Sequence, residues 1–386
     1  MSTAPMFPAD LLTKSDDERL AYYKDEVIVD HPALTDTLEE LDSKANPTLD
    51  RRLILLVGGT GLGKSAVAKK LVARRLARRK EQMLLRPEIV PAFLIELEPP
   101  DRGAFDFATL HGEGLVAMRA TLIDRTRPVV ERKTREGTLV TLAIENAKRT
   151  TSRGGLKIRF KSELISREVE LAAVDEAISL FKTGKRKSEK ERQEVLKDQA
   201  DKLKTFTNKT PATILLVGSF DFFELALTTG QVARRSVIVV MPPYTMTVEG
   251  LKGWGIALAG LIGHLPIEHD LRLEEVATEL FLQSIGCVGI AKGILSEALV
   301  RALRTGTRLT MELVRKCYYP AAALKQMGEE MEAGMKAVLE MTTLSTLAAK
   351  AEGTAEEVAA SQCPPARPLK PGETTPSHRN DAAGAW

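Results

Sequence analysis

The stretch LILLVGGTGLGKSAVAKKL, residues 53–71, joins an apolar run, a glycine-rich turn and a basic segment with helical spacing. Its GGTGLGKS part matches the phosphate-loop pattern G-x-x-x-x-G-K-[ST]. The glycines let backbone N–H groups turn towards phosphates, Lys64 reaches the β- and γ-phosphates, and the Ser65 hydroxyl can bind Mg²⁺. A plain strand-to-helix turn is the alternative. We predict ATP binding by Gly58, Gly59, Thr60, Gly61, Leu62, Gly63, Lys64 and Ser65.

Further short apolar runs rich in Val, Ile and Leu follow the phosphate loop. Runs of this length without polar alternation are typical of strands that are buried on both faces. Longer amphipathic or charged stretches separate them, as in a parallel sheet with crossover helices. The sequence therefore predicts an α/β nucleotide-binding core with a five-stranded parallel sheet. The strands are expected at residues 52–59, 90–97, 170–176, 212–219 and 236–241.

Changes in composition divide the chain into four regions. Residues 1–15 show no periodicity and are predicted to be flexible, and residues 16–245 hold two N-terminal helices and the α/β domain with a basic insertion. Residues 246–350 show helical periodicity almost throughout, which predicts a small all-helical domain. Residues 351–386 are rich in Pro, Ala, Thr and Gly, which predicts a disordered tail.

The overall composition excludes several classes of protein. The 386 residues carry a net charge of only +3, so a nucleic-acid partner must be argued from local basic patches. Three scattered cysteines and five histidines show neither a disulfide framework nor the spacing of zinc ligands. The N-terminus lacks a signal pattern, and the longest uncharged run, residues 253–267, is shorter than the ~20 residues of a membrane span. We expect a cytoplasmic protein without a membrane partner.

Polar residues at the ends of two later strands are candidates for the chemistry of hydrolysis. In ELAAVDEA, Asp175 could hold Mg²⁺ and Glu176 could act as the general base. Both acids could instead form the first turn of a helix, where the helix dipole stabilises negative charge. Ser219, just past the strand in ATILLVGSFD, could sense the γ-phosphate. Alternatively, GSFD is a strand-ending turn in which Asp221 caps the next helix.

Basic residues occur at two places, and each place has both a functional and a structural interpretation. Arg234 and Arg235 precede the last predicted strand, where a guanidinium can reach across a subunit boundary as an arginine finger. They could also be surface charges. The helix after the phosphate loop carries six Lys and Arg residues between positions 69 and 79, which either contact phosphates or form a solvated face.

In this order the motifs resemble those of an AAA+ ATPase, and more narrowly the TniB/TnsC family of transposition regulators. The likeness covers roughly residues 17–317, most of the chain. It rests on ERLAYYKDEVIVDHPALTDTLEELDSKA, LLVGGTGLGKS, AAVDEA, DKLKTFTNKTPATILLVGSFDFFELA and GQVARRSVIVVMPPYT, with LQSIGCVGIAKGILSEAL resembling the lid helices. The resemblance implies ATP and Mg²⁺ as cofactors, ATP hydrolysis, and self-assembly as a ring or filament on duplex DNA. It also implies a transposase and a target-selector protein as partners, with the ATPase marking the target site.

Contact with DNA is predicted to be independent of base sequence. Phosphate contacts need Lys and Arg, and the basic clusters contain few aromatic residues for stacking on bases. A solvated surface is the competing interpretation of these clusters. The predicted DNA-binding residues are Arg132, Lys133, Arg135, Lys148, Arg149, Arg153, Lys157 and Arg159.

Three other functions are compatible with parts of the pattern. An AAA+ replication initiator or helicase loader would share the core, and a winged-helix reader after the lid would favour it. A small-molecule kinase would share the phosphate loop, yet has little use for a long helical C-terminal domain. A nucleotide-gated scaffold would bind ATP and hydrolyse almost none of it. The lid also departs from many AAA+ proteins, because Lys292 is the nearest basic residue to the place of a second nucleotide sensor.

Overall fold

The computed structural model describes residues 6–45, 52–100, 103–120, 153–184, 188–208, 212–222 and 236–340. Residue contacts separate the chain into residues 1–335 and residues 336–386, and each part is described by itself.

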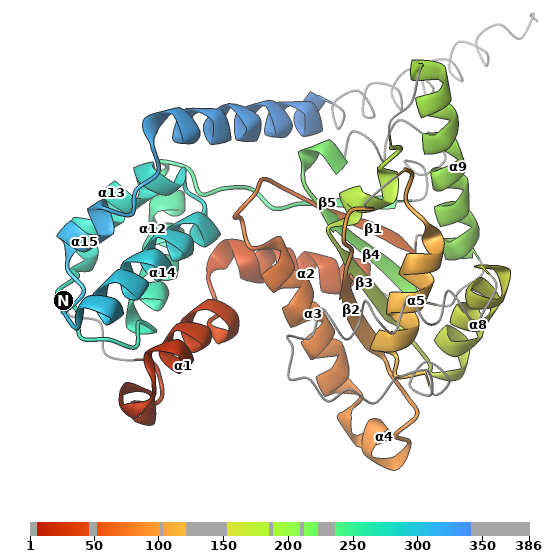
Figure 1. Ribbon diagram of the computed structural model, residues 1–386, viewed down its shortest axis with the longest axis horizontal. Helices are drawn as coiled ribbons and strands as arrows, with labels where there is room; N and C mark the ends of the chain where they lie inside the picture. The colour runs from red at the N-terminus through yellow and green to blue at the C-terminus, as the bar shows by residue number, and fades with distance from the viewer. Residues whose placement is uncertain are drawn as a thin grey trace, which may run out of the picture. The chain divides into compact units, whose positions relative to one another are not determined.

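A five-stranded parallel sheet forms the core, with the strand order β2-β3-β4-β1-β5 (Figure 1). The strand that leads into the phosphate loop, β1, lies between two others, so that Leu53 pairs with both Ile214 and Ser236. Every residue of β1, β3 and β4 is buried, which explains why their sequences lack polar alternation. All five predicted strands are therefore confirmed. They are β1 (Leu53–Val57), β2 (Ala92–Glu96), β3 (Leu171–Asp175), β4 (Thr213–Gly218) and β5 (Ser236–Val240).

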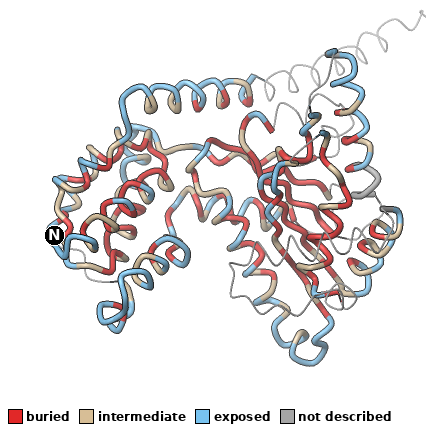
Figure 2. Tube along the Cα trace, viewed as in Figure 1, coloured by how far each residue is buried: buried red, intermediate tan, exposed pale blue. Residues whose placement is uncertain are grey.

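Helices cover both faces of this sheet. In Figure 1, α2 and α3 lie on one side of the strands and α5 lies on the other, with α8 packed outside α5. Figure 2 shows the buried residues concentrated along the strands and on the helix faces that meet them. The helices of the core are α2 (Pro32–Lys44), α3 (Lys64–Arg78), α4 (Lys80–Leu85), α5 (Phe107–Ala117), α8 (Arg153–Ser166), η3 (Ala177–Phe181) and α9 (Glu189–Asn208).

The N-terminal segment contains two α-helices, and the second of them begins at Pro32. Proline occupies the first position of α2, where its missing N–H group is not needed, and His31 caps the helix by accepting a hydrogen bond from the N–H of Leu34. Burial lowers the pKa of His31 to about 4. The preceding elements are η1 (Ala9–Thr13), α1 (Asp16–Ala21) and η2 (Tyr22–Glu26).

The predicted helical domain follows β5. Trp254 is fully buried at its centre, where its ring meets Phe281 edge-on and its indole N–H donates to the carbonyl of Ala277. The domain contains α12 (Val248–Gly263), α13 (Leu273–Ser284), α14 (Val288–Thr305) and α15 (Met311–Arg315). Residues 321–340 form a further helix, of which residues 321–335 belong to the first part of the chain.

Several hydrogen bonds join the helical domain to the N-terminal segment, and two of them come from one lysine. The Lys292 ammonium of α14 donates to the carbonyl oxygens of Lys24 and Val27, each at 2.8 Å. These two bonds tie Lys292 to the N-terminal segment. Among the described residues, no helix is both long and apolar enough to cross a bilayer.

Candidate nucleotide-binding site

The phosphate loop turns sharply between β1 and α3. Gly61 and Gly63 have φ angles of 77° and 100°, a left-handed region that favours glycine, and α3 begins directly afterwards at Lys64. The Lys64 ammonium donates to the carbonyl oxygen of Gly59 at 2.7 Å. The cationic group is thus already folded over the loop whose backbone N–H groups would hold phosphates.

The two predicted acids lie at the same edge of the sheet as this loop. Asp175 is the last residue of β3, and β4 alone separates β3 from β1. Since the strands are parallel, their carboxyl ends meet at one edge, where ligands of such sheets bind. Burial lowers the pKa of the Lys64 ammonium, and the carboxylates of Asp175 and Glu176 counteract part of this effect. Both acids therefore lie within electrostatic reach of Lys64.

Glu176 has an unusual backbone conformation for a residue with a side chain. Its φ of 51° and ψ of 40° are left-handed, and its N–H donates to the Oδ1 atom of Asp175 at 2.9 Å. Such conformations cost of order 1 kcal/mol or more and cluster at functional sites. Asp175 is the last residue of β3, and Glu176 precedes the short 3-10 helix η3. The two acids therefore do not form the first turn of a helix. The two carboxylates thus belong to consecutive residues at the end of β3.

A pocket of about 300 Å³ brings the phosphate loop together with the end of β4. Gly59 and Thr60 line it from the loop, and Ser219 and Asp221 line it from the segment after β4. Ser219 therefore lies where a polar side chain could contact the end of a polyphosphate. Asp221 lies within the short helix that starts at Phe220, so it does not occupy the capping position before that helix.

Parts of the chain that sequence reasoning did not connect with the site also line this pocket. Cys287 and Ile290 come from the start of α14, and Met327, Glu330 and Met331 come from the helix of residues 321–335. The N–H of Gly289 donates to the carbonyl of Gly61 at 2.7 Å, which ties α14 to the tip of the phosphate loop. Burial raises the pKa of the Cys287 thiol to about 12, so the sulfur stays protonated.

The predicted Mg²⁺ ligands fit the usual demands of that ion. Mg²⁺ in nucleotide sites is held by one or two protein oxygens, with phosphates and water completing the octahedron. Ser65, in the first turn of α3, and Asp175, at the end of β3, would supply a hydroxyl and a carboxylate. Among the described residues, no cluster of three or more His, Cys, Asp or Glu side chains could hold a metal without such help.

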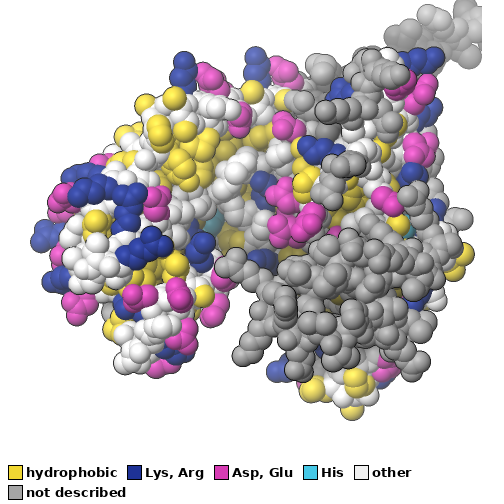
Figure 3. Space-filling view, viewed as in Figure 1, with side chains coloured by type: hydrophobic (Ala, Val, Ile, Leu, Met, Phe, Trp, Pro, Cys, Tyr) yellow, Lys and Arg dark blue, Asp and Glu magenta, His cyan; other side chains and the backbone are white. Residues whose placement is uncertain are grey.

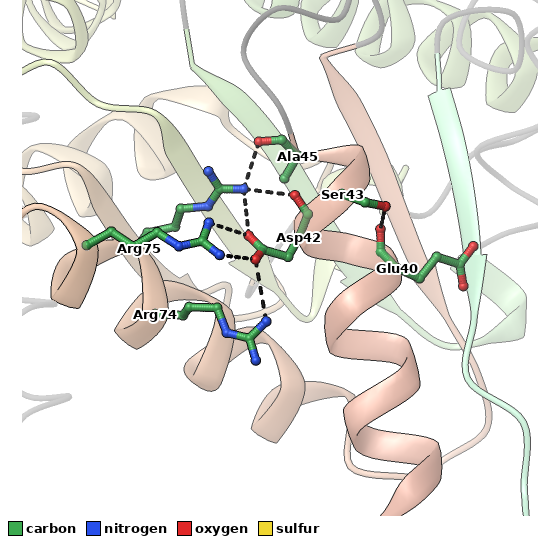
Figure 4. A network of polar contacts seen from close by, with 7 residues as sticks. Glu40, Asp42, Ser43, Ala45, Arg74 and Arg75 are labelled. Carbon is green, nitrogen blue, oxygen red and sulfur yellow. Dashed lines mark hydrogen bonds and ion pairs between the residues drawn. The ribbon is translucent and has the colours of Figure 1, made fainter.

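The arginines of α3 bind acids of the protein itself. Asp42 of α2 accepts from Arg74, Arg75 and Arg78, and Arg75 also donates to the carbonyl oxygen of Ala45 at 3.0 Å (Figure 4). The side chains of Asp42 and Arg75 are 11% and 9% exposed. These contacts favour the structural interpretation of the basic helix over phosphate contact. Separately, Lys70 pairs with Asp30, and Arg79 pairs with Glu168 and Glu170.

Replacing Asp42 with Asn is expected to destabilise the fold by about 3 kcal/mol, because it leaves the buried Arg75 guanidinium without its counter-ion. Burial opposes ionisation of Asp42, but its hydrogen bond with Arg78 and the charges of Arg75 and Arg78 outweigh it and lower its pKa. A carboxyl with a lowered pKa stabilises the fold fully above its unfolded value of about 3.9 and loses this effect as pH falls through the folded pKa.

Chemical denaturation at a series of pH values tests this prediction. The difference in unfolding free energy between the wild type and Asp42→Asn should be constant above about pH 5 and shrink below about pH 4. Asp36→Asn is the matched control, since Asp36 lies exposed on the same helix. A destabilisation that is equal for both variants, or independent of pH, would contradict the assignment of the network to Asp42.

Several predicted functional residues lie outside the described residues. These are Arg234 and Arg235, the predicted arginine finger, and five of the predicted DNA contacts, namely Arg132, Lys133, Arg135, Lys148 and Arg149. Arg153 begins α8, and Lys157 and Arg159 lie half-buried on that helix. Because α8 packs on α5 next to the β2 edge of the sheet, these residues are not part of the phosphate-loop pocket.

Comparisons with known proteins give structural neighbours only. The sequence matches no protein-family model, and no curated protein matches it. The ORC2 protein of Aeropyrum pernix, solved as ADPNP-ADP complexes, is 17% identical; the alignment covers 77% of this chain and 70% of that one at a TM-score of 0.47. The ORC1 protein of the same organism, in complex with DNA, is 17% identical over 78% and 68% at a TM-score of 0.46. Domain III of Thermotoga maritima DnaA is 12% identical over 78% and 98% at 0.42.

A P-loop strand inside a five-stranded parallel sheet, followed by a helical lid, is the architecture predicted from the sequence, and that prediction is confirmed. The resemblance to transposition regulators is not shown by these neighbours, one of which is named as a replication initiation protein. With identities under 25% and TM-scores under 0.5, these likenesses carry no argument about this chain.

Proposed function

We propose that this chain is an ATP-hydrolysing, DNA-binding AAA+ regulator of transposition. One observation carries the ATPase part of the proposal. The phosphate loop with Lys64, the acids Asp175 and Glu176, and the polar residue Ser219 converge on one edge of the sheet. A cation, a metal ligand, a base and a hydrogen-bond donor are the groups that hydrolysis of a nucleoside triphosphate needs.

Each residue of the AAA+ site has a distinct role in this proposal. Lys64 leaves the carbonyl of Gly59 and binds the β- and γ-phosphates, while Asp175 and Ser65 hold the Mg²⁺ that offsets their charge. Glu176 accepts the proton of the attacking water, and Ser219 donates to the γ-phosphate. Arg234 or Arg235 of a second copy completes the site, so that hydrolysis depends on assembly.

The DNA and transposition parts rest on the sequence resemblance to the TniB/TnsC family. In this proposal the ATP-bound chains assemble on duplex DNA, grip the phosphate backbone without reading bases, and recruit or activate a transposase. The basic residues of the segment from Arg132 to Arg159 supply the grip. A target-selector protein is the further partner that the resemblance implies.

A replication initiator or helicase loader is the second candidate function, because it would share the same core and phosphate loop. The two functions differ in how they treat DNA sequence. A regulator that marks many target sites binds unrelated duplexes equally well, whereas an initiator prefers its own site over unrelated DNA. A third candidate, a nucleotide-gated scaffold, would bind ATP at the same pocket with negligible turnover.

Fluorescence anisotropy of two unrelated labelled duplexes tests the proposal and separates the first two candidates. A non-hydrolysable ATP analogue should tighten binding of both duplexes by about 10-fold, a typical size of coupling between two sites. The affinity should fall steeply with salt, as expected for phosphate contacts. Lys64→Ala should bind both duplexes without responding to the analogue.

Three other outcomes would favour a different function or a different nucleotide site. A strong preference for one duplex would favour the initiator function over the regulator. Absence of DNA binding in the presence and absence of nucleotide would contradict both functions and leave the scaffold. A response to the analogue that persists in Lys64→Ala would place nucleotide sensing outside the phosphate loop.

A further inference from the structure

The helix of residues 321–335 lies over the nucleotide pocket. Met327, Glu330 and Met331 of this helix line the same pocket as Gly59, Thr60 and Ser219. Its apolar positions Leu324, Met327 and Met331 recur with helical spacing, as on a helix that packs by one face. In Figure 3 charged side chains follow the outer edge of this helix and hydrophobic side chains gather beside it.

Two glycines make this close packing possible, one on each partner. The buried Met331 side chain lies directly on Gly59, so a Cβ atom at position 59 would displace the flexible end of that side chain. Gly334 lies on the ring of Phe220, and a methyl group at Gly334 would overlap that ring. Glycine in a helix interior is destabilising, so Gly334 lowers the stability of the helix that contains it. The contact with Phe220, the residue after Ser219, supplies a reason for it.

The docked helix and a bound triphosphate oppose each other chemically. The thioether of Met331 offers nothing that can pair with a phosphate oxygen, and it covers the residue whose carbonyl now holds Lys64. Glu330 adds a carboxylate to the wall of the pocket, next to where the phosphates would bring further negative charge. The docked helix therefore weakens the binding of Mg-ATP, and bound Mg-ATP weakens the docking of the helix.

We propose that residues 321–335 form a gate helix, which closes the pocket in the nucleotide-free chain and is displaced when Mg-ATP binds. This inference rests on the proposed function in that the phosphate loop must bind ATP. Displacement uncovers the apolar face of the gate helix, the ring of Phe220 and the side of the pocket beside Ser219. Contacts that assembly requires on this face thus become available only to the ATP-bound chain.

Gly334→Ala tests the gate helix with little risk to the fold. The added methyl group overlaps Phe220 and prevents docking, while alanine favours the helix itself. If the closed state leaves about one chain in ten competent, the variant should bind ATP about 10-fold more tightly. In Gly334→Ala without ATP, the backbone amides of residues 321–335 should exchange with solvent faster than in the nucleotide-free wild type. Addition of ATP to the wild type should cause the same increase.

Two further variants make the test specific. Gly328→Ala is the matched control on the same helix, because its nearest neighbour, Cδ1 of Ile285, lies at 3.8 Å from the added carbon. It should leave ATP affinity and hydrogen exchange unchanged. Met331→Ala removes the contact with Gly59 without adding bulk, and its ATP affinity should rise as in Gly334→Ala.

The outcomes separate this inference from the proposed function. ATP binding of wild-type strength in Gly334→Ala and Met331→Ala, with unchanged exchange of residues 321–335, would overturn the gate and leave the ATPase proposal standing. Slower exchange of these residues on addition of ATP to the wild type would also overturn it. Absence of ATP binding in every variant and in the wild type would overturn both proposals.

Discussion

Lys64→Ala is expected to raise the dissociation constant of Mg-ATP by about 100-fold, since hydrogen bonds to charged groups contribute about 1.5–3 kcal/mol each. The ammonium lies at the start of α3 and already donates to the loop carbonyl of Gly59 at 2.7 Å. It therefore needs to move little to reach phosphates held by the same loop. No other described residue combines a cationic side chain with a place in the turn after β1.

Isothermal titration calorimetry of the full-length chain with ATP and Mg²⁺ measures this effect. Lys69→Ala is the matched control, because Lys69 is an exposed lysine on the same helix. Its affinity for ATP should equal that of the wild type. If Lys64→Ala retains wild-type affinity, the phosphate loop is not the nucleotide site, and the roles given to Asp175, Glu176 and Ser219 lose their basis.

Glu176→Gln is expected to slow hydrolysis by about 100- to 10,000-fold, the usual contribution of a general base. The amide keeps the size of the side chain but cannot take a proton from water. Binding of ATP should persist, since Glu176 is not among the residues that hold the phosphates. The backbone of residue 176 is left-handed in either case, so the substitution changes the chemistry of the site more than its geometry.

Steady-state phosphate release, measured alongside ATP affinity, distinguishes a base from a structural residue. Glu96→Gln is the control, since Glu96 is the residue of β2 that pairs with Asp175 at the same sheet edge. It should hydrolyse ATP at the wild-type rate. Unchanged turnover in Glu176→Gln would remove this residue as the base and favour the nucleotide-gated scaffold.

The features that sequence predicted well are those set by local pattern. The strands were visible because a strand buried on both faces must be apolar throughout, as β1 and β4 are. The phosphate loop was visible because its glycine and lysine positions are fixed by the turn. Asp175 and Ser219 lie at the same edge because parallel strands bring their carboxyl ends together, and their roles in the site stay predictions.

The features that sequence could not supply depend on contacts between distant residues. From the sequence, the basic face of α3 could be a solvated surface or a phosphate-binding one. Only the position of Asp42, more than 30 residues earlier, shows that three of its arginines are paired. The spacing of Leu324, Met327 and Met331 fits an amphipathic helix but does not show what that helix packs on. Gly334 was the one local signal, because a glycine inside a helix often marks a close approach.

We propose that this chain uses ATP to assemble on DNA. Electron microscopy of the full-length chain with duplex DNA tests this proposal most directly. Samples with ATP and Mg²⁺, with ADP and without nucleotide would be compared at one protein concentration, with Lys64→Ala beside the wild type. We expect ordered rings or filaments on DNA only for the wild type with ATP. Separate chains that ignore DNA under all three conditions would contradict it.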